Sequence, residues 1–174
     1  MKRYLKKLAP LICLVLFVGV IWIVFHATAE YPVLGDPVSY PVNQLAGFEL
    51  SIDEPSWKPF RGYTIRYKVQ YQSEALYQLI QERGKDYCHL DKLVDGQWRR
   101  MERTEAVPDA INGTLQIGGW PSSSAFSATF TQDFDHYGTR LEPGTYRLVL
   151  ELTADDGSSH YLAAEFYAKN AIGI

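Results

Sequence analysis

Cys88, His89 and Asp91 are the side chains of this 174-residue chain that come closest to a catalytic set. A thiol and an imidazole serve a thiol hydrolase when the imidazole lies within hydrogen-bond reach of the sulfur. Cys88 and His89 are consecutive residues of a predicted strand, so their side chains point to opposite faces and cannot form a dyad. We expect Cys88 to be a buried thiol that packs as a small apolar residue. A hydrolase in which His136 or His160 approaches Cys88 is the less favoured alternative.

Three other stretches carry residue types found in metal sites or nucleophiles. Asp133, Asp135 and His136 lack the glycine-bearing spacing of a calcium loop. Asp155-Asp156-Gly157 is typical of a turn, and Ser122-Ser123-Ser124 lacks the flanking glycines of a nucleophile elbow. We therefore predict that the protein is not an enzyme and has no catalytic residue, no metal site and no cofactor.

Basic side chains indicate a candidate interaction surface. Arg66, Lys68, Arg99, Arg100 and Arg103 are expected to form a basic patch on one sheet, although a solvated strand face has the same pattern. Four of the 17 basic residues lie in the first seven positions, so the rest of the chain carries 13 basic residues against 20 acidic ones. This acidic balance argues against nucleic-acid binding, which needs a basic stripe.

The strands that must position these residues are clearest between Tyr137 and Phe166. Pro143-Gly144 has turn chemistry, because proline pre-sets φ and glycine accepts a positive φ. Every second residue from Tyr146 to Leu152 is then apolar, which is the period of a half-buried strand. Leu141 before the turn and Tyr146 after it predict a tyrosine corner, in which the hydroxyl bonds to backbone upstream.

Further strands are predicted wherever apolar residues alternate. The segments are Gly47–Ile52, Tyr63–Tyr71, Asp86–Leu93, Trp98–Met101, Leu115–Ile117 and Ala125–Phe130. Asp95-Gly96 suits a type I′ hairpin, Ser73–Arg83 fits either a short helix or an edge strand, and the pairing within Glu102–Ser124 stays open. About seven strands without βαβ units favour an all-β antiparallel sandwich, with Trp98 and Tyr146 in its core.

The first 29 residues predict a signal anchor or a signal peptide. The uncharged run Leu8–Phe25 is about 27 Å long as a helix, close to the ~30 Å hydrocarbon core of a bilayer. Its basic flank predicts a cell-membrane protein with an extracytoplasmic C-terminal domain. Ala27-Thr28-Ala29 has the small-x-small form of a cleavage site, so secretion after cleavage following Ala29 is the alternative. Residues 30–46 are expected to be an extended linker, and residues 47–170 the sandwich domain.

Several short motifs resemble, in their order and spacing, those of a known family. They are Gly84-Lys85-Asp86-Tyr87, Leu93-Val94-Asp95-Gly96-Gln97-Trp98, Tyr137-Gly138, Leu141-Glu142-Pro143-Gly144-Thr145-Tyr146-Arg147-Leu148 and Ala163-Ala164-Glu165-Phe166. The segment that they cover, roughly Phe48 to Tyr167, is similar to a bacterial immunoglobulin-like domain family of exported and membrane-anchored Gram-positive proteins. The resemblance implies an immunoglobulin-like sandwich and no catalytic residues.

The expected function is that of a membrane-tethered, extracytoplasmic module that binds a partner or acts as a spacer. Its expected partners are the membrane, through the N-terminal helix, and a protein or cell-envelope component. An alternative is an accessory or regulatory subunit that contacts a membrane protein through the same helix.

Overall fold

The computed structural model of the chain describes residues 2–27, 31–53, 55–58, 62–81, 87–102, 113–119, 124–134, 137 and 141–169. These residues contain one helix and eleven strands. The chain divides into two compact units, Met1–Glu30 and Tyr31–Ile174.

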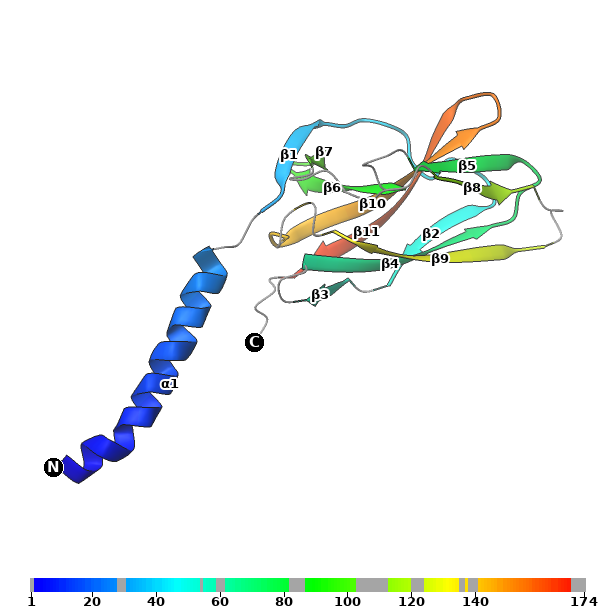
Figure 1. Ribbon diagram of the computed structural model, residues 1–174. Coiled ribbons are helices and arrows are strands. Elements are labelled where there is room, and N and C mark those ends of the chain that lie inside the picture. The colour runs from blue at the N-terminus through cyan, green and yellow to red at the C-terminus, as the bar shows by residue number, and fades with distance from the viewer. Residues whose placement is uncertain are drawn as a thin grey trace. The chain divides into compact units, whose positions relative to one another are not determined.

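The first unit contains helix α1 (Lys2–Ala27), which includes Pro10 (Figure 1). The large apolar side chains from Leu11 to Val24 are 49–64% exposed. Within the described part of the chain, no helix combines the length and the apolarity that are needed to cross a membrane. The membrane interpretation of Leu8–Phe25 stays a prediction.

The second unit is built from strands. They are β1 (Val33–Pro37), β2 (Phe48–Ile52), β3 (Ser56–Lys58), β4 (Gly62–Tyr71), β5 (Leu76–Gln81), β6 (Cys88–Val94), β7 (Gln97–Glu102), β8 (Gly113–Gly118), β9 (Phe126–Asp133), β10 (Gly144–Ala154) and β11 (Ser159–Ala168). Apart from an isolated bridge at Val42, the described pairs are antiparallel.

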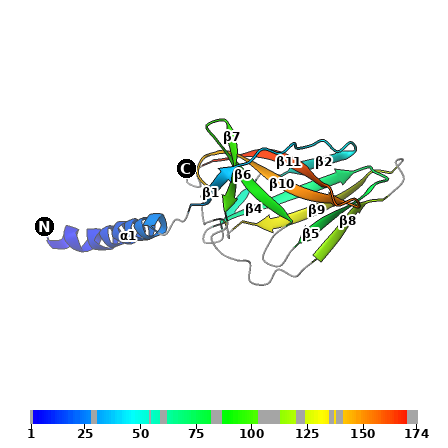
Figure 2. The ribbon, with the colours of Figure 1, turned by 90° about the horizontal axis from the view of Figure 1, so that it is seen from above.

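The strands form two sheets. The large sheet has the order β1-β7-β6-β10-β5-β8, and β11 runs along β10 (Figures 1 and 2). In the small sheet, β4 pairs with β2 and β3 and also with β9. Buried side chains from both sheets share one core, including Ile65, Tyr67 and Val69 of the small sheet and Leu90, Leu148 and Leu150 of the large one. The all-β antiparallel sandwich predicted from the sequence is confirmed at this level.

More strands are present than the seven or so that the sequence predicted. β1 and β3 were missed because both are short and lie among prolines, where no alternation of apolar residues is visible. The Ser73–Arg83 stretch contains strand β5, so the strand interpretation is right, but β5 is not an edge strand, because it pairs with β10 and with β8. Leu79 points into the core with 0% exposure, while the adjacent Ile80 is 45% exposed, as strand geometry requires.

The sequence predicted an extended linker over residues 30–46, but residues 31–46 belong to the second unit and contain a strand. The second unit begins at Tyr31, and β1 pairs with β7 through Val33–Glu102 and Leu34–Met101. Proline is compatible with an edge strand, since its missing N–H can face away from the partner. The segment is therefore part of the folded domain.

The hairpin turn that the sequence predicted at Asp95-Gly96 is present. Asp95 and Gly96 have φ angles of 51° and 76°, and they join the paired residues Val94 and Gln97 in a two-residue hairpin loop. Two successive positive φ values are the mark of a type I′ turn. The prediction is confirmed.

The tyrosine corner is also confirmed. The Tyr146 hydroxyl donates a 2.8 Å hydrogen bond to the carbonyl oxygen of Glu142, and the Tyr146 side chain is fully buried. Leu141 is buried, Pro143 is exposed and Gly144 begins β10 with φ 157°.

Trp98 is the exception among the predicted structural residues. It is only half-buried, because its position in β7 places it on the outer face of the large sheet.

Candidate functional site

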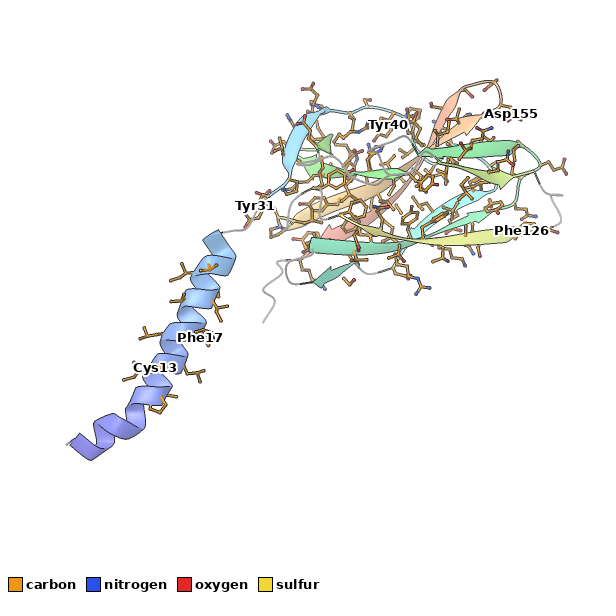
Figure 3. All side chains as sticks on the ribbon, in the orientation of Figure 1. Cys13, Phe17, Tyr31, Tyr40, Phe126 and Asp155 are labelled. Carbon is orange, nitrogen blue, oxygen red and sulfur yellow. The ribbon has the colours of Figure 1, made fainter. Side chains whose placement is uncertain are left out.

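The outer face of the large sheet carries a cluster of polar side chains from three adjacent strands. Asp91 on β6 lies opposite Arg100 on β7 and opposite Arg147 on β10. His89 precedes Asp91 by two residues and shares its face. Tyr40 reaches the group from the segment between β1 and β2 (Figure 3). We call Tyr40, His89, Asp91, Arg100 and Arg147 the polar cluster.

Asp91 and Arg147 form the buried centre of the polar cluster. Asp91 is 0% exposed and Arg147 is 5% exposed. The Arg147 Nε donates a 2.9 Å hydrogen bond to Asp91 Oδ2, and Nη2 lies 2.9 Å from the same oxygen. The guanidinium is also flanked by the rings of Trp98, at 4.5 Å, and Tyr40, at 5.0 Å. These cation–π contacts help to offset the loss of hydration of a buried charge.

Tyr40 closes the polar cluster from outside the sheet. Its hydroxyl donates a 2.5 Å hydrogen bond to Asp91 Oδ2 and lies 2.9 Å from His89 Nε2. Its ring stacks on Tyr161 at 4.4 Å. Burial, followed by the hydrogen bond to Asp91, raises the pKa of Tyr40 to about 12. The phenol therefore stays protonated at neutral pH and acts as a donor.

Asn43 fixes the same segment to β11. Its backbone N–H donates to the Tyr161 carbonyl at 2.8 Å. Its side chain donates to the Ala163 carbonyl at 2.9 Å and accepts from the Ala163 N–H at 2.8 Å. These two hydrogen bonds take the place of those that a neighbouring strand would make. Asn43 has φ 56°, a conformation that asparagine tolerates better than most residues. We call residues 38–45 the covering segment, because Tyr40 lies over the outer face of the large sheet while Asn43 binds the edge of β11.

His89 joins the exposed rim of the polar cluster to its buried centre. Its Nε2 lies 2.8 Å from Arg100 Nη2 and 3.6 Å from Asp91 Oδ1. Because arginine can only donate, a hydrogen bond from Arg100 requires Nε2 to be the unprotonated nitrogen. Asp91 Oδ1 and Arg147 Nη2 are the buried side-chain atoms without a hydrogen bond among the described residues. The polar cluster can hold Tyr40 and the covering segment in place. The Tyr40 phenol donates a hydrogen bond to Asp91 and is not positioned as a nucleophile.

Cys88 and His89 lie on opposite faces of β6, as predicted. Cys88 is 2% exposed and belongs to the core, whereas His89 lies in the polar cluster on the outer face. The placement of Cys88 agrees with a buried thiol and gives no support to a hydrolase that uses it.

The predicted loop and turn residues are only partly described. Asp133 accepts a 2.6 Å hydrogen bond from the Thr64 hydroxyl. Asp135, His136 and Ser122-Ser123 lie outside the described residues. Among the residues that are described, no group of three or more His, Cys, Asp or Glu side chains is arranged to hold a metal ion.

The turn at Asp155-Asp156-Gly157 contains a serine, a histidine and an aspartate close together. The Ser158 hydroxyl donates to Asp156 Oδ1 at 2.6 Å, and His160 Nε2 lies 3.2 Å from the same hydroxyl oxygen. Hydrogen bonds from Ser158 hold the pKa of Asp156 below its usual value. Because the serine proton is directed to a weakly basic carboxylate, this group does not activate a nucleophile. It stabilises the turn, as the sequence predicted.

The basic residues do not form one patch on one sheet. Arg66 and Lys68 lie on β4 of the small sheet, while Arg99 and Arg100 lie on β7 of the large sheet. Arg99 donates to the Gly35 carbonyl at 3.5 Å, and Arg100 belongs to the polar cluster. Arg103 lies outside the described residues. Sequence alternation assigned these residues to strand faces but could not assign the strands to sheets.

Tyr40 and Arg147 were not identified as site residues from the sequence, and Asp91 was considered only beside Cys88 and His89. Tyr40 lies among prolines without any periodic pattern. Arg147 looked like an ordinary solvated position of a half-buried strand. The available signal was its place beside the apolar run Leu148-Val149-Leu150, where a charge needs a buried partner.

No protein-family model matches the chain, and no curated protein matches it. A solved structure described as the X-ray structure of Northeast Structural Genomics Consortium target SoR45 is similar to it at 12% sequence identity, with a TM-score of 0.35. The similarity covers 78% of this chain and 93% of that chain.

Proposed function

We propose that the protein is a membrane-tethered, extracytoplasmic immunoglobulin-like module that binds a protein or cell-envelope partner and performs no chemistry of its own. The exposed apolar side chains of α1 support the tether, because an apolar surface of this extent is favourable only in apolar surroundings. The basic residues at positions 2, 3, 6 and 7 support an extracytoplasmic domain. The tyrosine corner between Tyr146 and Glu142 supports the immunoglobulin-like assignment.

The observation that carries the binding role is the difference between the two outer sheet faces. Tyr40 of the covering segment lies over part of the outer face of the large sheet, and Asn43 binds that segment to the edge of β11. No described segment is hydrogen-bonded across the outer face of the small sheet in the same way. Every second residue of strands β2, β4 and β9 places a polar side chain on the outer face of the small sheet. These residues are Glu49, Ser51, Arg66, Lys68, Gln70, Ser127, Thr129 and Thr131. Most of them are exposed.

Arg66 and Lys68 are the basic groups of this polar face. Arg66 is paired only loosely with Asp53, at 3.7 Å, and their side chains are 65% and 70% exposed. An exposed ion pair of this kind contributes little stability, roughly 0–1 kcal/mol. Both basic groups can therefore bind an acidic partner with little loss of folding stability.

Capture of partners from native membranes tests this proposal. We expect Arg66→Glu and Lys68→Glu, made in the tagged full-length chain, to reduce the recovery of one specific partner at unchanged protein abundance. Lys169→Glu is the matched control, since it reverses an exposed charge at the end of β11 on the other sheet. Equal recovery with all three variants would contradict binding through the small sheet.

A further inference from the structure

Strand β9 forms an edge of the small sheet. Among the described strands it pairs with β4 alone (Figure 2). The pairing runs from Phe126–Tyr71 to Asp133–Thr64 without a shift in register, so the edge is eight residues long and regular. In an antiparallel pair, alternate backbone N–H and C=O groups point away from the partner strand. β9 therefore presents a straight row of hydrogen-bonding groups on its other side.

This edge lacks the features that usually prevent strand pairing. Charged side chains, prolines and bulges normally protect the edges of a sheet. Residues 126–132 contain no charged residue and no proline, and the one charged residue of β9, Asp133, lies at its end. By contrast, edge strand β1 contains Pro37 and has a register shift between Leu34 and Pro37. Edge strand β8 is shorter and has Gly113 and Gly118 at its ends.

The inner face of β9 is also incompletely covered. Phe126, Ala128 and Phe130 are only half-buried, whereas the neighbouring β4 residues Tyr67 and Val69 are 2% and 0% exposed. The Phe130 ring stacks on Tyr67 at 5.1 Å. A strand added beside β9 would complete the burial of these apolar side chains, in addition to binding the backbone.

We propose that β9 pairs with β9 of a second copy of this chain, antiparallel and centred on Thr129. This register places side chains of the same face opposite one another, as sheet geometry requires. Thr129 then faces Thr129, Ala128 faces Phe130 and Ser127 faces Thr131. A small residue lies opposite a large one, hydroxyl groups lie opposite hydroxyl groups, and no like charges meet. The neutral edge suits its own copy better than a charged partner.

The symmetric pairing has a defined consequence. Because the two-fold axis passes through Thr129, the same β9 residues of both copies form the interface. The small sheets of the two copies join into one continuous sheet, and its outer face carries Arg66 and Lys68 of both copies. This inference rests on the edge alone and does not depend on the partner proposed above.

Disulfide formation in native membranes tests the register. Full-length chains carrying Cys13→Ser, to remove the exposed thiol of α1, receive one new cysteine each: Thr129→Cys, Ser127→Cys or Thr131→Cys. Directly opposed residues have Cα atoms about 4.5–5.5 Å apart, a separation that a disulfide can bridge. Ser127 of one copy is four residues out of register with Ser127 of the other, about 14 Å away at ~3.4 Å per residue.

Mild oxidation with copper phenanthroline should shift the Thr129→Cys chain from 19.8 kDa to twice that mass on a non-reducing gel. Neither Ser127→Cys nor Thr131→Cys should dimerise alone, but the two should cross-link when co-expressed with different tags. Adding Thr129→Lys to that mixed pair should abolish the cross-link at unchanged abundance.

Three results would overturn the proposal. They are the absence of a dimer at Thr129, equal cross-linking at all three positions, which indicates random collision, and adducts formed only with other proteins. The Cys13→Ser parent, in which Cys88 is the remaining thiol, measures the background.

Discussion

Arg147 and Asp91 lie opposite each other across β10 and β6, joined by a 2.9 Å hydrogen bond from Nε to Oδ2, and both are removed from water. The pair lies on the outer face of a sheet, which is usually solvated. It is buried because Tyr40 and Trp98 cover the guanidinium. The Asp91–Arg147 ion pair between β6 and β10 thus depends on the covering segment, which supplies Tyr40.

Removing the charge of Asp91 should be strongly destabilising. Asp91→Asn keeps the shape but leaves the Arg147 guanidinium buried without a counter-ion, and breaking such a pair costs about 3–5 kcal/mol. Chemical denaturation followed by tryptophan fluorescence measures the loss. Replacing both Asp91 and Arg147 by leucine should recover most of that stability, since a buried ion pair is often no better than an apolar pair. A double variant as unstable as Asp91→Asn would contradict this account.

Two substitutions at Tyr146 separate the stability contributed by its hydrogen bond from the stability contributed by its buried ring. Tyr146→Phe removes only the bond to the Glu142 carbonyl and should cost about 0.5–1.5 kcal/mol. Tyr146→Ala also leaves a cavity in the core, so a loss of about 3–5 kcal/mol is expected. Denaturant unfolding compares the two variants with the parent. Small and equal losses would mean that the corner does not stabilise the fold.

Much of the fold followed from the sequence, and the reasons are local. Alternation in Tyr63–Tyr71 and Tyr146–Leu152, together with the Asp95-Gly96 turn, predicted strands and a hairpin that the structure contains. These signals depend on neighbouring residues. Which strands share a sheet depends on contacts between distant residues, so Arg66 and Arg100 were wrongly assigned to one surface.

The candidate site could not be predicted for the same reason. Tyr40 and Asp91 are 51 residues apart in the chain, and neither belongs to a recognisable motif. The covering segment has too few apolar residues to show a period, and side-chain hydrogen bonds of Tyr40 and Asn43 hold it in place. A pattern of apolar residues carries no information about such contacts.

Stability should fall at alkaline pH through Tyr40. Its pKa is raised to about 12 in the folded protein, against about 10 in an unfolded chain. The stabilising contribution of the neutral phenol is fully present below pH ~10 and is lost as the pH rises towards 12. Denaturation at a series of pH values should show a shallower decline for Tyr40→Phe than for the parent. Tyr167→Phe, at a 60% exposed position, is the control and should leave the decline unchanged.

Asn43 should protect one backbone amide of β11. Asn43→Ala removes the acceptor of the Ala163 N–H and also places alanine at a positive φ. We expect faster hydrogen exchange at Ala163 and lower stability. Asn43→Gly tolerates the φ angle, so it should retain more stability while losing the same protection. Unchanged exchange at Ala163 in both variants would show that the covering segment is not held by this side chain.

Protease accessibility on intact cells or protoplasts tests the proposed membrane tether with the sandwich outside the cell. Added protease should digest Tyr31–Ile174 while a fragment that contains Leu8–Phe25 stays in the membrane fraction. Cytoplasmic marker proteins must remain intact. A mature protein that begins at Glu30 and is free in the medium would contradict the tether, and a sandwich that is degraded only after cell lysis would contradict the extracytoplasmic location.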